Sequence, residues 1–184
     1  MPIENERKLV LDIKNPEGFK NLLESYQYST TLEFKQGYVN DNTRIREVKE
    51  NGVVKQLIFT FKKKINGQLI EIETPILQSD FDALWTQVNK VINKVRVAIA
   101  DENFYTWEVD FFIDQATKEY YLVMAEVELP EGMEMPPSVP PFIADNLLYL
   151  VPPTDMRFMN TQLVQPKLVK KTLEDLRNGN KLHA

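Results

Sequence analysis

The sequence lacks several of the residues on which common catalytic sites depend. Its 184 residues include no cysteine and one histidine, His183, which is the penultimate residue. The absence of cysteine excludes disulfides, thiolate metal sites and cysteine nucleophiles, and it fits the reducing cytoplasm in which we expect the protein to act. A single histidine excludes a histidine-based zinc site. A Ser-His-Asp triad would need an imidazole held more firmly than we expect of a penultimate residue.

Glycine-rich motifs, long apolar runs and excess positive charge are also missing. The six glycines form neither G-x-x-x-x-G-K-S/T nor G-x-G-x-x-G, so any phosphate would have to be bound by side chains. No run of about 20 apolar residues occurs, and charged residues begin at Glu4, so we expect neither a membrane span nor a secretory signal peptide. The formal net charge of −5 argues against non-specific nucleic-acid binding.

What is present is an ordinary globular composition, with 43% hydrophobic and 27% charged residues. A chain of this length can bury a sizeable core in one domain. We therefore interpret residues 1–184 as a single domain, in which 166–184 form a C-terminal helix and tail.

Strand-like runs dominate the chain. Turn signals such as Asn51-Gly52 and Asn66-Gly67 separate them and indicate antiparallel hairpins. The predicted strands are 3–11, 31–40, 42–50, 53–64, 68–77, 94–101, 104–114 and 119–129. Helical spacing, with Asn15-Pro16 as a helix start, predicts helices elsewhere. The predicted helices are 16–28, 80–92, 139–150 and 166–178. The sequence thus predicts an α+β, mainly β, domain.

Charged residues stand two apart in nearly every predicted strand. Residues two apart share one face of a strand, and the residues between them are mostly apolar. The sets are Glu4, Glu6 and Lys8; Arg44 and Arg46; Thr60, Lys62 and Lys64; Glu71 and Glu73; Lys94 and Arg96; Glu108 and Asp110; Glu126 and Glu128. An open sheet with one solvent-exposed face would show this pattern. The alternative is a sheet closed on itself, with the charged face inside and the helices outside.

A face that carries both acids and bases has a specific chemistry. Carboxylate oxygens suit hard cations such as Mg²⁺ or Mn²⁺. Lysine and arginine suit phosphate oxygens, and arginine can bind them in a two-pronged fashion. Mixed signs also lower the cost of enclosing charge. A closed interior of this kind would hold a metal–phosphate complex.

A set of short blocks resembles the CYTH, or triphosphate tunnel metalloenzyme, superfamily. The stretch ENERK at 4–8 matches its Glu-x-Glu-x-Lys signature, and further blocks follow in the family's order. They are QGYV at 36–39, RIR at 44–46, TFK at 60–62, EIE at 71–73, KVR at 94–96, WEVDFF at 107–112, AEVEL at 125–129 and DMRFMNTQL at 155–163. The resemblance covers roughly residues 3–163, most of the chain.

The resemblance implies a closed eight-stranded antiparallel β-barrel tunnel with helices packed outside, and metal-dependent hydrolysis of a triphosphate. It implies that the triphosphate is bound by Lys8, Arg44, Arg46, Lys62, Lys94, Arg96 and Arg157. For Arg157, a surface ion pair is an equal alternative. The resemblance implies that Mg²⁺ or Mn²⁺ is held, directly or through water, by Glu4, Glu6, Glu71, Glu73, Asp110, Glu126 and Glu128. The resemblance also implies that Glu4, Glu6 and Lys8 are the catalytic residues.

Three functions remain open from the sequence. The first is a metal-dependent triphosphatase acting on inorganic triphosphate or on a nucleoside or organic triphosphate. The second is an adenylate-cyclase-type nucleotidyl cyclase, and the third is a non-catalytic binder of a phosphorylated nucleotide. Acids at every matched position count against the third. We expect a small triphosphate-bearing partner, with nucleic acid entering only as an RNA 5′-triphosphate end. The oligomeric state stays open, with a homodimer as one option.

Overall fold

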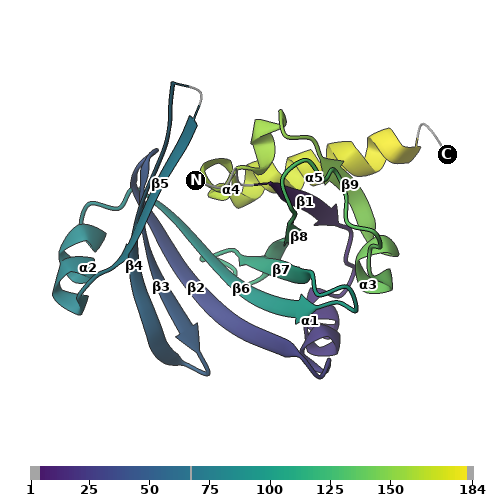
Figure 1. Cartoon of the computed structure of the whole chain (residues 1–184), viewed down its shortest axis with the longest axis horizontal. Coiled ribbons are helices and arrows are strands. Elements are labelled where there is room, and N and C mark those ends of the chain that lie inside the picture. Colours follow the sequence, from purple (N-terminus) through teal and green to yellow (C-terminus); the bar gives the residue numbers. More distant parts are fainter. Residues whose placement is uncertain (1–4, 67, 182–184) are drawn as a thin grey trace.

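A computed structural model describes residues 5–66 and 68–181 of the chain. These residues form one antiparallel sheet of nine strands in the order β5-β4-β3-β2-β6-β7-β8-β1-β9 (Figure 1). The strands are β1 (Glu6–Leu11), β2 (Ser29–Asn40), β3 (Thr43–Glu50), β4 (Val53–Ile65), β5 (Gln68–Pro75), β6 (Lys90–Ala100), β7 (Thr106–Ile113), β8 (Tyr120–Glu128) and β9 (Leu147–Val151). Asn51 and Gly52 both have positive φ, 52° and 76°, as the predicted β3–β4 hairpin requires.

Five α-helices and one 3₁₀ turn accompany the sheet in the described part of the chain. They are α1 (Pro16–Glu24), α2 (Gln78–Trp85), α3 (Pro141–Ala144), η1 (Met156–Phe158), α4 (Asn160–Leu163) and α5 (Pro166–Lys181). The predicted cap of α1 is confirmed, because the Gly18 amide donates to Asn15 Oδ1 at 3.0 Å. The predicted α+β, mainly β, class is confirmed as well. None of the described helices is both long enough and apolar enough to cross a membrane.

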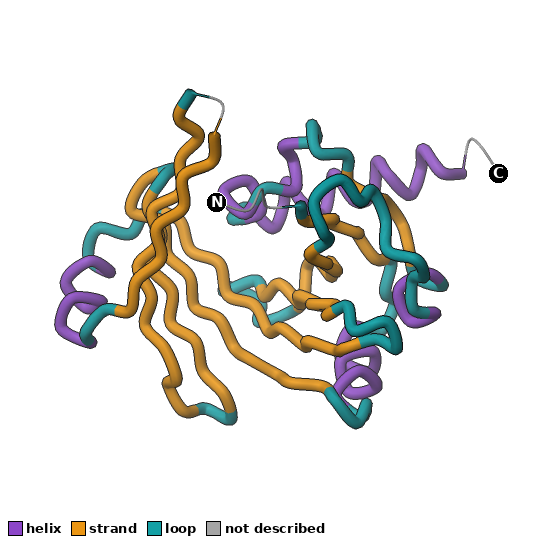
Figure 2. The backbone as a smooth tube through the Cα atoms, in the orientation of Figure 1, coloured by secondary structure: helices purple, strands orange, loops and turns teal. Residues whose placement is uncertain are grey.

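The sheet is strongly curved but open, so the prediction of a closed eight-stranded barrel is wrong for this structure (Figures 1 and 2). The ninth strand explains the difference. The segment 139–150 was predicted to be one helix, but it contains only the short α3, and Leu147–Val151 forms β9. This strand pairs with β1 on the side opposite β8. Both edges of β1 are therefore occupied, and the sheet ends at β5 and β9, which do not pair with each other.

One face of the sheet is packed as an apolar core. It buries Val97, Trp107, Val109, Phe111 and other apolar side chains at odd positions of β1, β6, β7 and β8. Leu23 of α1 and Ile143 of α3 pack into the same cluster. Burying these large side chains supplies the main apolar stabilisation of the domain. The charged residues of these strands consequently point to the other face.

The C-terminal elements lie on that other face, which corrects the expectation that all helices pack outside. Phe158 of η1, Leu163 of α4 and two residues of α5, Val169 and Leu173, pack in a second apolar cluster. Their partners include Val10, Ile92, Phe112, Leu122 and Met124, all at even positions of the strands. These positions share parity with Lys8, Lys94, Asp110 and Glu126. The C-terminal helices therefore cover one end of the face that carries the charges (Figure 1).

Candidate active site

The even positions of the strands bring most of the predicted residues onto one concave face, here called the charged face. Lys8 lies opposite Glu126, Arg96 opposite Asp110, and Glu108 opposite Glu126 in the register of β1, β6, β7 and β8. On the same face but nearer to the β5 edge, Arg46 lies opposite Gln36 and Arg44 opposite Thr60. The shared parity that the sequence predicted is thus present, although the sheet around it is open.

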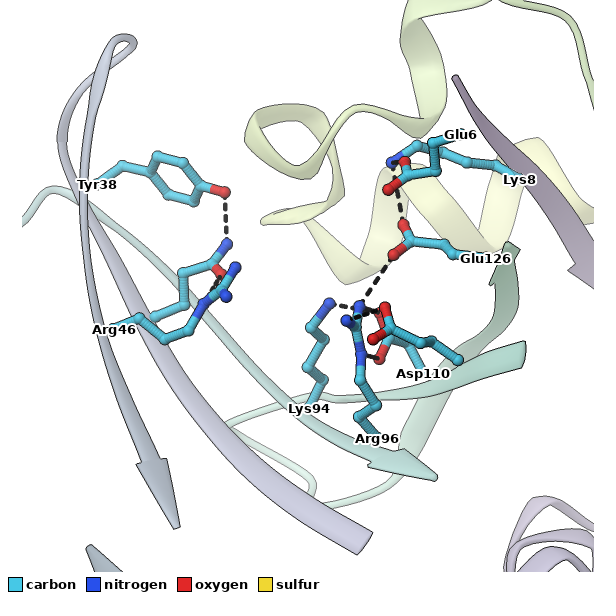
Figure 3. A network of polar contacts seen from close by, with 10 residues as sticks. Glu6, Lys8, Tyr38, Arg46, Lys94, Arg96, Asp110 and Glu126 are labelled. Carbon is cyan, nitrogen blue, oxygen red and sulfur yellow. Dashed lines mark hydrogen bonds and ion pairs between the residues drawn. The ribbon is translucent and has the colours of Figure 1, made fainter. Parts of the chain in front are cut away.

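Arg96 is the centre of an ionic network on β6, β7 and β8 (Figure 3). Its Nε and Nη2 atoms donate to the two oxygens of Asp110, each at 2.7 Å. Nη2 also donates to Glu126 at 2.9 Å, and Nη1 bonds to Glu108. Every nitrogen of this guanidinium therefore has a carboxylate partner, and the acids raise the pKa of Arg96 despite its burial.

Glu126 links this network to β1. Its Oε1 atom accepts from Lys8 Nζ at 3.0 Å, and Lys8 is also 3.0 Å from Glu6. Burial raises the pKa of Glu126, but the attraction of Lys8, Lys94 and Arg96 outweighs burial and brings the pKa down to about 2. Burial likewise opposes the charge of Lys8, yet Glu126 and Glu6 hold its pKa above the ordinary value. Both groups are ionised at neutral pH.

Asp110 anchors two cations rather than presenting a free carboxylate. Its side chain is fully buried, and its two oxygens bond to Lys94 and Arg96. Burial lowers the pKa of Lys94, against the attraction of Asp110 and together with the repulsion of Arg96. If an oxygen of Asp110 turned from these partners to a metal ion, buried positive charge would be left uncompensated. This geometry favours a positioning role for Asp110 over the metal-binding role that the resemblance implied.

Arg46 has different surroundings on β3. Its Nε atom donates to Gln36 Oε1 at 3.1 Å, and its guanidinium lies over the ring of Phe34 at 5.1 Å. None of the described carboxylates forms an ion pair with it. Burial lowers the pKa of Arg46 to about 10, and the nearby charges of Arg44 and Arg96 add to this effect. Arg46 is therefore a cation with donors to spare, which is the state expected of a group that receives an anion.

A third group of contacts crosses β3, β4 and β5. Arg44 Nη2 is 3.4 Å from Glu73, whose Oε1 atom also accepts from the Thr60 hydroxyl at 3.0 Å. The Nε atom of Arg44 is buried and has no hydrogen-bond partner. Lys62 Nζ is 3.1 Å from Glu71. The two acids of β5 thus pair with bases of their neighbours, on strands far from β1 and β8 in the sheet order.

Two further predicted residues, Arg157 and Glu128, form no ion pair with these groups in the described part of the chain. Arg157 bonds to Asp155 at 2.6 Å with a half-exposed side chain, which is the surface ion pair given as its alternative. Glu128 is exposed near the start of β1, where its carboxylate accepts from the Asn5 amide at 3.4 Å. Glu4 lies outside the described residues.

Three residues of the charged face stand in the sequence motifs without a predicted role. Glu108 shares parity with Asp110 and bonds to Arg96. Gln36 and Tyr38 stand two apart in the QGYV block and are almost completely buried. Spacing was the available signal for all three. Pairing could not be predicted, because it depends on the register of strands distant in sequence.

The carboxylates of the charged face are chemically suited to bind a hard divalent cation, but several of them form ion pairs with lysine and arginine side chains. Glu6 lies opposite Glu128 and Glu108 opposite Glu126, so carboxylates of the kind that Mg²⁺ and Mn²⁺ prefer are neighbours on adjacent strands. Among residues 5–66 and 68–181, however, no three acidic or histidine side chains converge on one point. A cation at these acids would share or displace the ion pairs of Lys8 and Arg96.

Comparison with known proteins by sequence is negative, since no protein-family profile and no curated protein matches the chain. Solved structures do match. The crystal structure of the inorganic triphosphatase NE1496 has a TM-score of 0.52 and 20% sequence identity, and the match covers 89% of this chain and 95% of that chain. This chain shares its fold with an inorganic triphosphatase. The triphosphate tunnel resemblance predicted from the sequence is thereby confirmed at the level of the fold.

Two further structures are similar at lower scores. The PH1819 protein from Pyrococcus horikoshii OT3 matches at a TM-score of 0.45 and 17% identity, over 96% of this chain and 89% of that chain. The putative adenylyl cyclase HpAC1 from Hippeastrum, described as having a dominant triphosphatase activity, matches at a TM-score of 0.41 and 16% identity, over 70% and 80%.

Proposed function

We propose that this protein hydrolyses a triphosphate with the help of Mg²⁺ or Mn²⁺, inorganic triphosphate being the favoured substrate. The observation that carries the proposal is the state of Arg46, whose guanidinium has no carboxylate partner among the described residues. It faces the same concavity as the acids of β1, β7 and β8 (Figure 3). A face with this arginine on one side and clustered carboxylates on the other suits a polyphosphate bound together with a divalent cation.

In this proposal the phosphates bind first to the bases of β3 and β4. Arg46 offers its Nη atoms, and Arg44 offers a buried Nε atom that has no partner. Guanidinium groups bind phosphate oxygens through short charge-assisted hydrogen bonds. Lys62, Lys8 and Lys94 are further candidates, and each would shift part of its interaction from a neighbouring acid to the substrate.

The metal belongs, in this proposal, to the acids of β1 and β8. Glu6, Glu126 and Glu128 are the main candidates, with Glu4, and with Glu71 and Glu73 from β5 as outer groups. When bound, a divalent cation would offset phosphate charge and lower the pKa of an adjacent water. Glu126 is ready for such a role because its neighbours keep its pKa near 2, so it carries full charge at neutral pH.

The protein's own residues supply orientation. Asp110 fixes Arg96 through two hydrogen bonds, and Arg96 in turn holds the carboxylates of Glu108 and Glu126. Phosphoryl transfer depends mainly on positioning and on stabilising the charge of the transferred group. A histidine base is not required by this scheme.

One assay separates the proposal from the other two readings. The purified protein is offered inorganic triphosphate and ATP, each with Mg²⁺ or Mn²⁺, and the products are identified. Release of phosphate from triphosphate supports hydrolysis. Release of pyrophosphate together with cyclic AMP from ATP would replace the proposal by a cyclase, and binding without product would replace it by a binder. Arg46→Ala should lose most of the activity. Arg177→Ala is the matched control, because Arg177 pairs with Asp12 away from this network.

A further inference from the structure

Gln36 is a completely buried polar side chain in the middle of the charged face. It projects from β2 directly opposite Arg46 of β3, with 0% of its surface exposed. Its Oε1 atom accepts from Arg46 Nε at 3.1 Å, and its Nε2 atom donates to the Tyr38 hydroxyl (Figure 3). A buried amide of this kind is tolerated only where both ends find partners. Gln36 therefore links Arg46 to Tyr38, and these two are the hydrogen-bond partners of its amide among the described residues.

The chemistry of these partners fixes which way the amide points. A guanidinium nitrogen can only donate, so the group that faces Arg46 has to be the amide oxygen. The amide nitrogen then faces Tyr38, whose oxygen accepts. Turning the amide over would set two donors against each other at Arg46. The orientation of Arg46 is thus tied to a side chain that has a single favourable arrangement.

The backbone around Gln36 is held in place from the opposite face of the sheet. Gly37 lies between Gln36 and Tyr38, and a Cβ atom there would come within 2.8 Å of Trp85 and 2.6 Å of Val88. The segment around the end of α2 therefore sits directly against the β2 backbone. Gln36 and Tyr38, on either side of Gly37, project to the charged face from a strand segment that has little room to move.

We propose that Gln36 is a positioning residue that fixes the Arg46 guanidinium without neutralising it, so that its charge remains available to a bound polyphosphate. This inference rests on the proposed function, and it explains how one group of the proposed site, Arg46, is oriented before the substrate binds. A glutamate at the same position would hold Arg46 more tightly, but it would pair with the charge that the anion needs. The contrast with Arg96, whose nitrogens all contact carboxylates, shows what a neutralised arginine looks like on the same face.

The test compares Gln36→Glu with Gln36→Leu. Binding of inorganic triphosphate is measured by calorimetry alongside the melting temperature. We expect Gln36→Glu to be at least as stable as wild type and yet to bind triphosphate about tenfold more weakly, the size of one charge-assisted contact. Gln36→Leu should bind more weakly by a smaller factor. In an Arg46→Ala background neither change should have any further effect on affinity.

Gln87→Glu is the matched control, because it adds the same charge at an exposed turn after α2 and should leave affinity unchanged. A merely structural role predicts the opposite order, with Gln36→Glu binding as wild type and Gln36→Leu losing stability alone. That order would overturn the inference. So would an equal loss of affinity in the Arg46→Ala background.

A second measurement keeps this inference separate from the proposed function. The Nε–H signal of Arg46 can be followed by ¹⁵N NMR without any substrate. It should report an ordered, slowly exchanging group in wild type and in Gln36→Glu, and a mobile one in Gln36→Leu. If wild type neither binds nor hydrolyses triphosphate, the proposed function fails whatever this signal shows. If the signal is the same in wild type and Gln36→Leu, Gln36 does not position Arg46 and the inference fails.

Discussion

At the scale of single residues, two arginines of the charged face, Arg46 and Arg96, differ in their contacts. Arg96 contacts Asp110, Glu108 and Glu126, whereas Arg46 contacts a neutral amide and an aromatic ring. The same substitution at these two positions should therefore affect stability in different ways.

Arg46→Ala should leave the fold intact and weaken substrate use. Because Arg46 has no described carboxylate partner, its removal leaves no buried carboxylate unpaired. It also relieves the electrostatic repulsion between Arg46 and the neighbouring Arg44 and Arg96. The buried Gln36 oxygen loses its hydrogen bond from Arg46, which offsets this gain, so the melting temperature should change little. KM for triphosphate should rise about tenfold to a hundredfold, with a lower kcat, as charge-assisted contacts to the phosphates are lost. Unchanged kinetics would remove Arg46 from the site.

Arg96→Ala should instead destabilise the protein. It leaves the fully buried Asp110 with Lys94 as its remaining ionic partner and deprives Glu126 of one of its hydrogen bonds. Breaking a buried ion pair by removing one member typically costs about 3–5 kcal/mol. Urea unfolding of the two alanine variants side by side measures the difference. Equal free energies of unfolding would show that the network around Arg96 contributes little.

The depressed pKa of Glu126 predicts a specific acid sensitivity. Its pKa is about 2 in the folded protein and 4.5 in an unperturbed glutamate. As pH falls below 4.5 the unfolded chain takes up this proton first, so the stabilisation is complete above that pH and is lost as pH falls toward 2. The loss is on the order of 3 kcal/mol. Glu126→Gln should show a correspondingly flatter fall of unfolding free energy between about pH 5 and about pH 2. The same pH dependence in both proteins would contradict the assignment.

At the scale of elements, strand positions were largely predictable from turn chemistry and alternation. Seven predicted strands agree with β2 to β8 within a few residues, and the Asn15 cap begins α1 as expected. The segment 147–151 was not predictable in this way. Five consecutive apolar or aromatic residues fit a buried helix or a strand equally well, and pairing with β1 decided the outcome.

Close packing of α2 against β2 gives an element-scale prediction. In Gly37→Ala the new methyl group would overlap Trp85 and Val88, so the free energy of unfolding should fall by about 1–3 kcal/mol. Affinity for triphosphate should fall with it, because Gln36 and Tyr38 flank the displaced position. Gly179→Ala is the control, since a Cβ there meets nothing within 4 Å, and a glycine-to-alanine change in a helix stabilises by up to about 1 kcal/mol. Equal stability of the two variants would show that the contact tolerates a side chain.

At the scale of the whole molecule, the sequence predicted which face carries the charges but not how far the sheet curves. Parity assigns Lys8, Arg46 and Glu126 to one face, and the structure agrees. Parity does not indicate whether the two edge strands pair, since side chains alternate between the two faces in the same way in an open and in a closed sheet. Strand β9, which continues the sheet beyond β1, and the C-terminal helices on the charged face both follow from long-range packing.

The central claim is that the acids of the charged face serve a divalent cation during triphosphate hydrolysis. The most direct test is the rate of phosphate release from inorganic triphosphate against the concentration of Mg²⁺ or Mn²⁺, for wild type and Glu126→Gln. Wild type should be inactive after chelation and recover with added metal. Glu126→Gln should need more metal and stay slower at saturation, because the amide keeps the shape but not the charge. Full turnover by chelator-treated wild type would contradict the account.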